Sequence, residues 1–180
     1  MSETKEYTIT VFTENKTGLI SRVVSIFTRR HINIESLTTS QSSLEGIHRF
    51  TIVIYSNESQ VRKLVGQLEK QVEVMKAFFD KNHEIVHQEI ALYKVPTKAF
   101  SAGEKIERLI RSHNARILVI EPEFTVIEKT GHQEETEALL EDLKEIGIYE
   151  FVRSGRVAIT KPMERLNKYL ESLEKNYIIK

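Results

Sequence analysis

The feature that most constrains this chain is a change in the spacing of its apolar residues near Gly18. Residues 7–13 alternate between two faces, with Tyr7, Ile9 and Val11 on one of them, a pattern typical of a β-strand. After Gly18 the spacing becomes four, as in Leu19, Val23 and Phe27, which places these side chains on one face of a helix. We therefore predict a strand, a short loop with Thr17 as the helix N-cap, and a helix.

The rest of the first half continues the same alternation of patterns. Residues 34–41, 48–55 and 72–79 have the composition of strands, whereas residues 58–70 carry apolar residues at helical spacing. The order strand, helix, strand, strand, helix, strand is that of a split βαβ unit. It predicts a four-stranded antiparallel sheet with two helices on one face.

The second half repeats this order without an evident repeat of residues. It offers a strand at 86–94, a helix around Ile106, a hairpin of residues 116–120 and 124–129, a helix at 133–145 and a strand at 148–153. We predict an α+β protein of two ferredoxin-like βαββαβ domains, residues 1–82 and 83–160. A charged amphipathic tail, residues 161–180, follows them.

Composition narrows the possible functions. The 180 residues contain 26 Lys and Arg, 26 Asp and Glu, and no cysteine, so there is no basic excess for nucleic acid, no disulfide and no thiolate site. No signal peptide or membrane span is evident, which favours a cytoplasmic protein. Each small sheet would leave one face uncovered, so we expect at least a homodimer.

The loop between the first strand and the first helix is the candidate binding site. Unpaired amides at a helix start favour an anion, and Gly18 lets a ligand approach the backbone. Asn15 and Asn33 supply amide groups, while Ile20 and Ile34 supply apolar contacts. The loop could hold a free amino acid, although the same connection is common in proteins that bind none.

A family resemblance favours the amino-acid site. The pattern E-N-x-x-G-L-x-S-R-V, then F-x-x-R, then N-I-E-S-L-T, runs from Glu14 to Thr38. It resembles the ACT domain of acetolactate synthase small subunits. Residues 89–95 (E-I-A-L-Y-K-V) and 153–155 (R-S-G) resemble that family's second domain, so the resemblance covers about residues 5–160.

The resemblance implies a regulatory chain with no catalytic residue, metal site or cofactor of its own. Its partner would be the catalytic large subunit, which carries thiamine diphosphate, magnesium and FAD. The chain would activate that subunit and confer feedback inhibition by valine or a related branched-chain amino acid, bound between two ACT domains of a homodimer. The matching effector-binding positions are Asn15, Lys16, Thr17, Gly18, Leu19, Ile20, Asn33 and Ile34.

Two departures from the family pattern concern the identity of the effector. The loop is N-K-T-G where N-E-S-G is familiar, and His31-Ile32 replaces a glycine and an aromatic residue.

Two other functions remain open at this point. A free-standing ACT-type sensor could regulate another enzyme or a transcription factor. The segment His83-Glu84-Ile85-Val86-His87 matches H-E-x-x-H, which on a helix would bind zinc for peptide hydrolysis. The alternation of the residues after His83 instead predicts a strand there.

Overall fold

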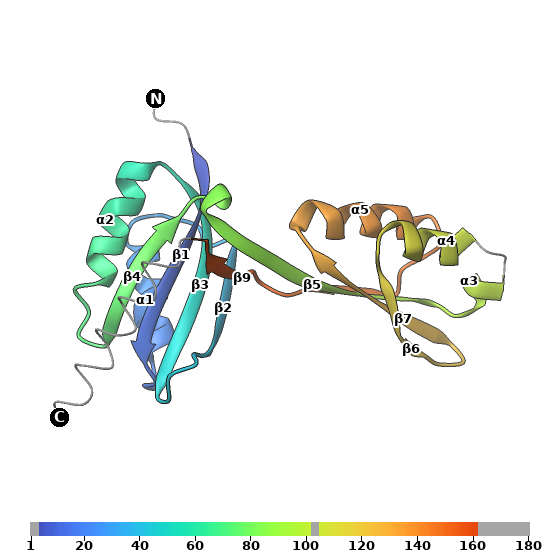
Figure 1. Cartoon of the computed structure of the whole chain (residues 1–180), viewed down its shortest axis with the longest axis horizontal. Coiled ribbons are helices and arrows are strands. Elements are labelled where there is room, and N and C mark those ends of the chain that lie inside the picture. The colour runs from blue at the N-terminus through green and yellow to red at the C-terminus, as the bar shows by residue number, and fades with distance from the viewer. Residues whose placement is uncertain (1–3, 102–104, 162–180) are drawn as a thin grey trace. The chain divides into compact units, whose positions relative to one another are not determined.

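The computed structural model describes residues 4–101 and 105–161, which form two compact units (Figure 1). The first unit contains residues 4–86 together with 158–161, and the second contains residues 87–157. Strand β5 (Ile85–Pro96) begins in the first unit and continues into the second. Within the described residues no helix combines the length and apolar character needed to cross a membrane.

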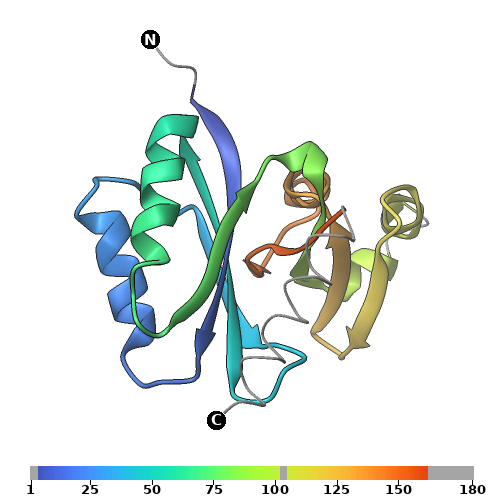
Figure 2. The ribbon, with the colours of Figure 1, turned by 60° about the vertical axis from the view of Figure 1, so that its left-hand side comes forward.

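The first unit is a four-stranded antiparallel sheet in the order β2-β3-β1-β4. Its elements are β1 (Lys5–Glu14), α1 (Leu19–Thr28), β2 (Ser36–Gln41), β3 (Ile47–Ser56), α2 (Glu58–Leu68) and β4 (Val74–Asp80). Both helices cover the same face of the sheet (Figure 2). The predicted order of elements and the ferredoxin-like arrangement are confirmed.

The core of this unit follows from the two periodicities in the sequence. Ile9 and Ile52 are opposite each other on β1 and β3, and both are completely buried beneath the helices. Phe27 of α1 and Leu64 of α2 pack into the same core. Burying side chains of this size stabilises the fold by about 1.5–3 kcal/mol each. The side chain of Asn57 caps α2 by accepting a hydrogen bond from the Gln60 amide at 3.0 Å.

The second unit has the same topology, with the order β6-β7-β5-β8. A short 3₁₀ turn, η1 (Asn82–Glu84), precedes β5. The elements after β5 are α3 (Lys98–Ser101), α4 (Lys105–Ser112), β6 (Arg116–Ile120), β7 (Phe124–Gly131), α5 (Gln133–Lys144) and β8 (Glu150–Arg153). Tyr93, Ile106, Ile127 and Leu139 form its buried centre. The second ferredoxin-like domain is thereby confirmed.

Helix α1 of the first unit and helix α4 of the second unit end in the same way. After α1, His31 takes a left-handed φ of 53°, and the amides of His31 and Ile32 donate to the carbonyls of Thr28 and Phe27. After α4, Asn114 takes a φ of 51°, and the amides of Asn114 and Ala115 donate to Arg111 and Ile110. Both are Schellman motifs, which normally carry glycine at the left-handed position. The repeat is one of backbone geometry, not of residues.

Three details differ from the sequence prediction or lie beyond it. Thr17 does not cap α1; the N-cap is Gly18, with φ 81° and no side-chain cap. A further strand, β9 (Val157–Thr160), pairs with β5, and the short helix α3 was not predicted either. The amphipathic tail predicted for residues 161–180 lies, apart from Lys161, outside the described residues.

Candidate functional site

A pocket of about 480 Å³ lies in the first unit where β1 runs into α1. Three strands, β1, β2 and β3, and helix α1 contribute to it besides the connecting loop. Its lining residues are Thr13, Glu14, Asn15, Lys16, Thr17, Gly18, Leu19, Ile20, Ser21, Thr39, His48 and Phe50. The pocket therefore joins the loop that the sequence singled out to one end of β3.

Backbone amides at the start of α1 make this pocket suitable for an anion. The Leu19 amide donates to the Lys16 carbonyl at 3.3 Å, and the first helical hydrogen bond runs from the Arg22 amide to the Gly18 carbonyl. The amides of Ile20 and Ser21 thus precede the helical ladder, as expected for a helix start. The first turn contains no acidic residue, so no carboxylate of that turn offsets the positive end of the helix dipole.

The start of the loop is held in place by two contacts. The Asn15 amide donates to the Gly46 carbonyl of the β2–β3 hairpin at 2.9 Å. The Lys16 ammonium lies 2.5 Å from a Glu14 carboxylate oxygen, and this hydrogen bond raises the pKa of the exposed lysine. Lys16 consequently stays charged, with its ammonium turned toward Glu14.

The inner wall of the pocket combines one polar group with apolar surfaces. Thr13 is completely buried, and its hydroxyl has no hydrogen-bond partner among the described residues. Leu19 and Phe50 are buried beside it, whereas Ile20 is 47% exposed at the opening. A buried hydroxyl without a partner is unfavourable, so a small polar ligand that reached it through a shift of this wall would supply the missing hydrogen bond. Amides for a carboxylate, a hydroxyl and apolar surfaces together match a small aliphatic amino acid.

The structure brings six of the eight predicted binding residues to this pocket. These are Asn15, Lys16, Thr17, Gly18, Leu19 and Ile20. Asn33 and Ile34 do not line it: Asn33 is exposed and donates its side-chain N–H to Glu35 at 2.8 Å, and Ile34 packs against the core of the first unit.

Several lining residues were missed by the sequence analysis. Thr13 and His48 are cross-strand partners, and so are Thr39 and Phe50. The register of β1, β2 and β3 brings them to the loop, and nothing in the local sequence marks them as binding residues.

The structure does not support a zinc peptidase site at residues 83–87. His83 lies in η1 and His87 lies on β5, so the two imidazoles do not share one helical face. The His87 Nε2 atom is instead 2.9 Å from the Nδ1 atom of His132. Across the described part of the chain, no group of three or more potential ligands could hold a metal ion.

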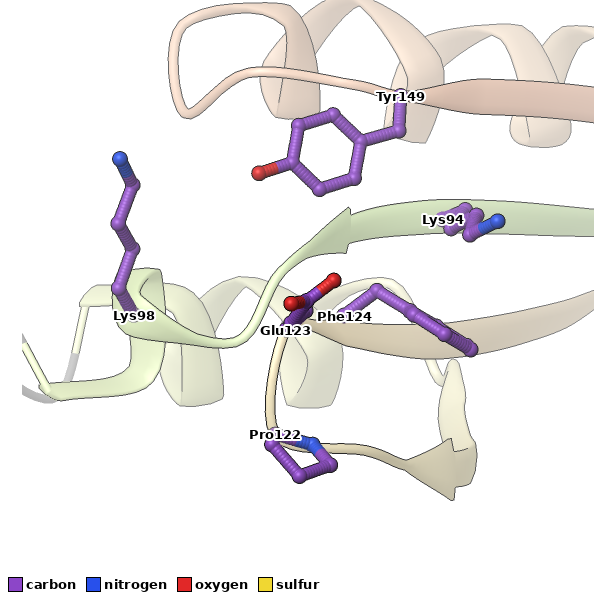
Figure 3. Close-up of a pocket in the computed structure, with 6 residues that line it drawn as sticks. All are labelled: Lys94, Lys98, Pro122, Glu123, Phe124 and Tyr149. Carbon is purple, nitrogen blue, oxygen red and sulfur yellow. The ribbon is translucent and has the colours of Figure 1, made fainter.

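A second pocket, of about 600 Å³, lies in the second unit (Figure 3). It is lined by Lys94, Lys98, Pro122, Glu123, Phe124 and Tyr149. The Lys94 ammonium lies 4.5 Å from the centre of the Phe124 ring and 3.8 Å from a Glu150 oxygen. Lys98, Glu123 and Tyr149 are exposed, so this pocket is a shallower and more polar feature than the first.

Comparison with known proteins gives one consistent family. Residues 9–76 match the family profile described as "AHAS small subunit-like ACT domain", and residues 88–162 match "Small subunit of acetolactate synthase". The acetolactate synthase small subunit of Bacillus subtilis is 36% identical over 154 residues, covering 85% of this chain and 89% of that protein. The corresponding protein of Mycobacterium bovis is 33% identical over 157 residues, covering 87% and 93%.

A solved structure agrees with these sequence matches. The crystal structure of the acetolactate synthase small subunit from Thermotoga maritima superposes with a TM-score of 0.80 at 28% identity. The match covers 88% of this chain and 98% of that one.

Proposed function

The chain belongs to the family of acetolactate synthase small subunits, the non-catalytic regulatory subunits of that enzyme, and on this premise we propose that it senses a branched-chain amino acid for a catalytic large subunit. It binds that subunit, raises its activity and makes it sensitive to feedback inhibition. L-Valine is the effector that we propose first. Thiamine diphosphate, magnesium and FAD belong to the catalytic partner in this proposal.

The observation that carries the effector proposal is the pocket at the start of α1. A carboxylate would accept hydrogen bonds from the Ile20 and Ser21 amides, where the helix dipole favours negative charge. The amide oxygen of Asn15 and the hydroxyl of Thr13 are acceptors for the ammonium group. Leu19, Ile20 and Phe50 supply apolar surface for an aliphatic side chain. No charged group of an effector would then be left without a partner, as a ligand in a small pocket requires.

We further propose that two copies of the chain complete the site. Asn33 is exposed and does not line the pocket of its own chain, and Ile20 is exposed at the pocket opening. If a two-fold axis relates the first units of two copies, Asn33 of one copy can contact the effector in the pocket of the other. The same contact then occurs twice, because a two-fold interface repeats each contact. The proposed assembly is thus a homodimer through the ACT domains.

Reconstitution tests this function directly. The cognate catalytic subunit is assayed for acetolactate formation alone and with this chain, each with and without L-valine. We expect the chain to increase activity and L-valine to reverse the increase. Calorimetry on the isolated chain should show L-valine binding, and Asn15→Ala should weaken it.

The possible outcomes separate the two halves of the proposal. Stimulation without any response to valine, leucine or isoleucine would refute the effector site and retain the partner. A folded chain that fails to stimulate the catalytic subunit would refute the partnership itself.

A further inference from the structure

Strand β3 separates the proposed effector pocket from a second feature on the opposite face of the sheet. His48 and Phe50 line the pocket. Arg49 lies between them, and neighbouring side chains of a strand point to opposite faces. The guanidinium of Arg49 accordingly stacks on the ring of its cross-strand neighbour Phe12, 5.6 Å from the centroid. Phe12 in turn precedes Thr13, which lines the pocket.

On that opposite face Arg49 holds the segment that we call the strap, residues 158–161. The Arg49 Nη2 atom donates to the Ala158 carbonyl at 2.5 Å, and Ala158 is buried. The Thr160 hydroxyl lies 3.5 Å from a carboxylate oxygen of the buried Asp80. The strap thus rests on polar groups of the first sheet, and Figure 1 shows β9 beside that sheet.

The end of the strap is attached to the start of β5. The Lys161 amide donates to the Glu84 carbonyl, and the Lys161 ammonium donates to the His83 carbonyl, both at 2.9 Å. Few side-chain bonds hold the strap, and its strand β9 also pairs with β5. Segments held by a few exposed hydrogen bonds open more easily than strands of a core. Release of the strap would break these bonds and leave the hydrophobic cores of both units intact.

The strap is also the direct continuation of the second unit. Only residues 154–157 separate it from β8, whose residues pair with β5 in the second sheet. A displacement of the strap would therefore act on the backbone close to the edge of that sheet.

We propose that Arg49 couples the effector pocket to the second unit by latching the strap when the pocket is occupied. An effector in contact with Thr13, His48 and Phe50 fixes the paired ends of β1 and β3, and hence the Phe12–Arg49 stack on the reverse side. The latched strap is the state that inhibits the catalytic partner. This inference rests on the proposed function, because it assigns the route by which the same site acts. An effector changes an equilibrium only by binding its two states unequally.

The test compares Arg49→Met with a matched control, Arg62→Met, in the full chain. Methionine keeps the aliphatic length of the side chain and loses the hydrogen bond to Ala158. Arg62 also stacks on a phenylalanine, Phe79, at 5.4 Å, but lines no part of the pocket. Three properties are measured: L-valine binding by calorimetry, inhibition of the reconstituted enzyme, and amide hydrogen exchange at residues 158–161 with and without L-valine.

For Arg49→Met we expect L-valine to bind within about twofold of the wild-type affinity, while the concentration for half-inhibition rises at least about tenfold. L-Valine should slow exchange in the strap of the wild type and of Arg62→Met, but not of Arg49→Met. Thr160→Val, which loosens the strap and leaves Arg49 intact, should show a smaller change in the same direction.

Each result bears on one of the two proposals. Two results would overturn the coupling but not the effector site. One is undiminished inhibition by L-valine in Arg49→Met with normal L-valine binding. The other is hydrogen exchange at residues 158–161 of the wild type that L-valine does not change. A wild-type chain that binds no L-valine in calorimetry would instead refute the effector site, and the coupling to it as stated.

Discussion

The amide of Ile32 lies 3.1 Å from the carbonyl oxygen of Phe27, and this hydrogen bond closes the C-terminus of α1. It forms because His31, between them, adopts a φ of 53°. That conformation suits glycine, since a Cβ atom there approaches the following carbonyl. The glycine familiar in the family at this position thus has a structural reason, and this chain accepts strain at His31.

His31→Gly should therefore stabilise the protein. The substitution relieves about 1–2 kcal/mol of strain. Glycine loses more backbone entropy on folding, which costs about 0.5–1 kcal/mol, so the net gain in stability is about 0.5–1 kcal/mol. Urea unfolding measures it. Asn114→Gly, at the equivalent turn of the second unit, is the control and should gain less, because asparagine tolerates this conformation. Destabilisation by His31→Gly would contradict the strain argument.

Gly18→Asp should abolish or strongly weaken effector inhibition and preserve stimulation. A Cβ atom on Gly18 would meet no atom within 4 Å, so bulk alone is tolerated within the chain. The added carboxylate would stand where the effector carboxylate is expected, at the start of α1. Gly18→Asn has nearly the same shape and the same backbone strain without the charge. Feedback lost equally in both variants would show that charge is not the cause.

Thr13→Val separates a binding role from a structural one. The hydroxyl is buried and has no partner in the described part of the chain, so replacing it by a methyl group should leave stability unchanged or raise it by about 0.5–1 kcal/mol. Loss of a hydrogen bond to the effector ammonium should weaken binding by about tenfold. Thermal unfolding and calorimetry measure the two effects. Unchanged effector affinity would remove Thr13 from the binding site.

A shared site predicts complementation between two defective variants. Asn15→Ala and Asn33→Ala should each bind the effector weakly as homodimers. When the two variants are unfolded and refolded together in equal amounts, half of the dimers are mixed. Each mixed dimer carries one intact site, so about a quarter of all sites in the mixture are intact. Calorimetry should then recover that fraction of wild-type binding. No recovery, with mixed dimers shown by mass spectrometry, would place Asn33 outside a shared site.

Tyr93 predicts a specific pH dependence in the second unit. Its ring is completely buried and its hydroxyl donates to the Thr136 carbonyl at 2.6 Å. Burial raises the pKa of Tyr93 to about 12, against an opposing effect of Arg153. Because the folded pKa lies above the unfolded value near 10, this stabilisation is complete below about pH 10 and is lost as the pH rises toward 12.

Absorbance at 295 nm should accordingly show a late ionisation phase near pH 12 that belongs to Tyr93. Tyr93→Phe should destabilise the protein by about 1 kcal/mol at neutral pH and should remove the latest phase of the titration. A titration that keeps this phase in Tyr93→Phe would show that another tyrosine is responsible.

The order of elements was determined by the sequence alone, because it depends on local spacing. Alternation at residues 7–13 and spacing by four from Leu19 each require only neighbours along the chain, and both identified their elements correctly. The loop from Asn15 to Gly18 was also recognisable, since glycine between a strand and a helix marks a place where a ligand can reach backbone amides. Thr17 was wrongly chosen as N-cap because Gly18 satisfies the same backbone position without a side chain.

The tertiary structure decided everything that depends on register and on distant segments. Thr13 meets His48 only because β1 and β3 pair antiparallel with that alignment, and a shift by one residue would turn every side chain to the other face. Arg49 meets Ala158 across 109 positions of sequence. No local pattern encodes such a contact, because it is fixed by the packing of the strap onto the sheet and not by the spacing of neighbouring residues.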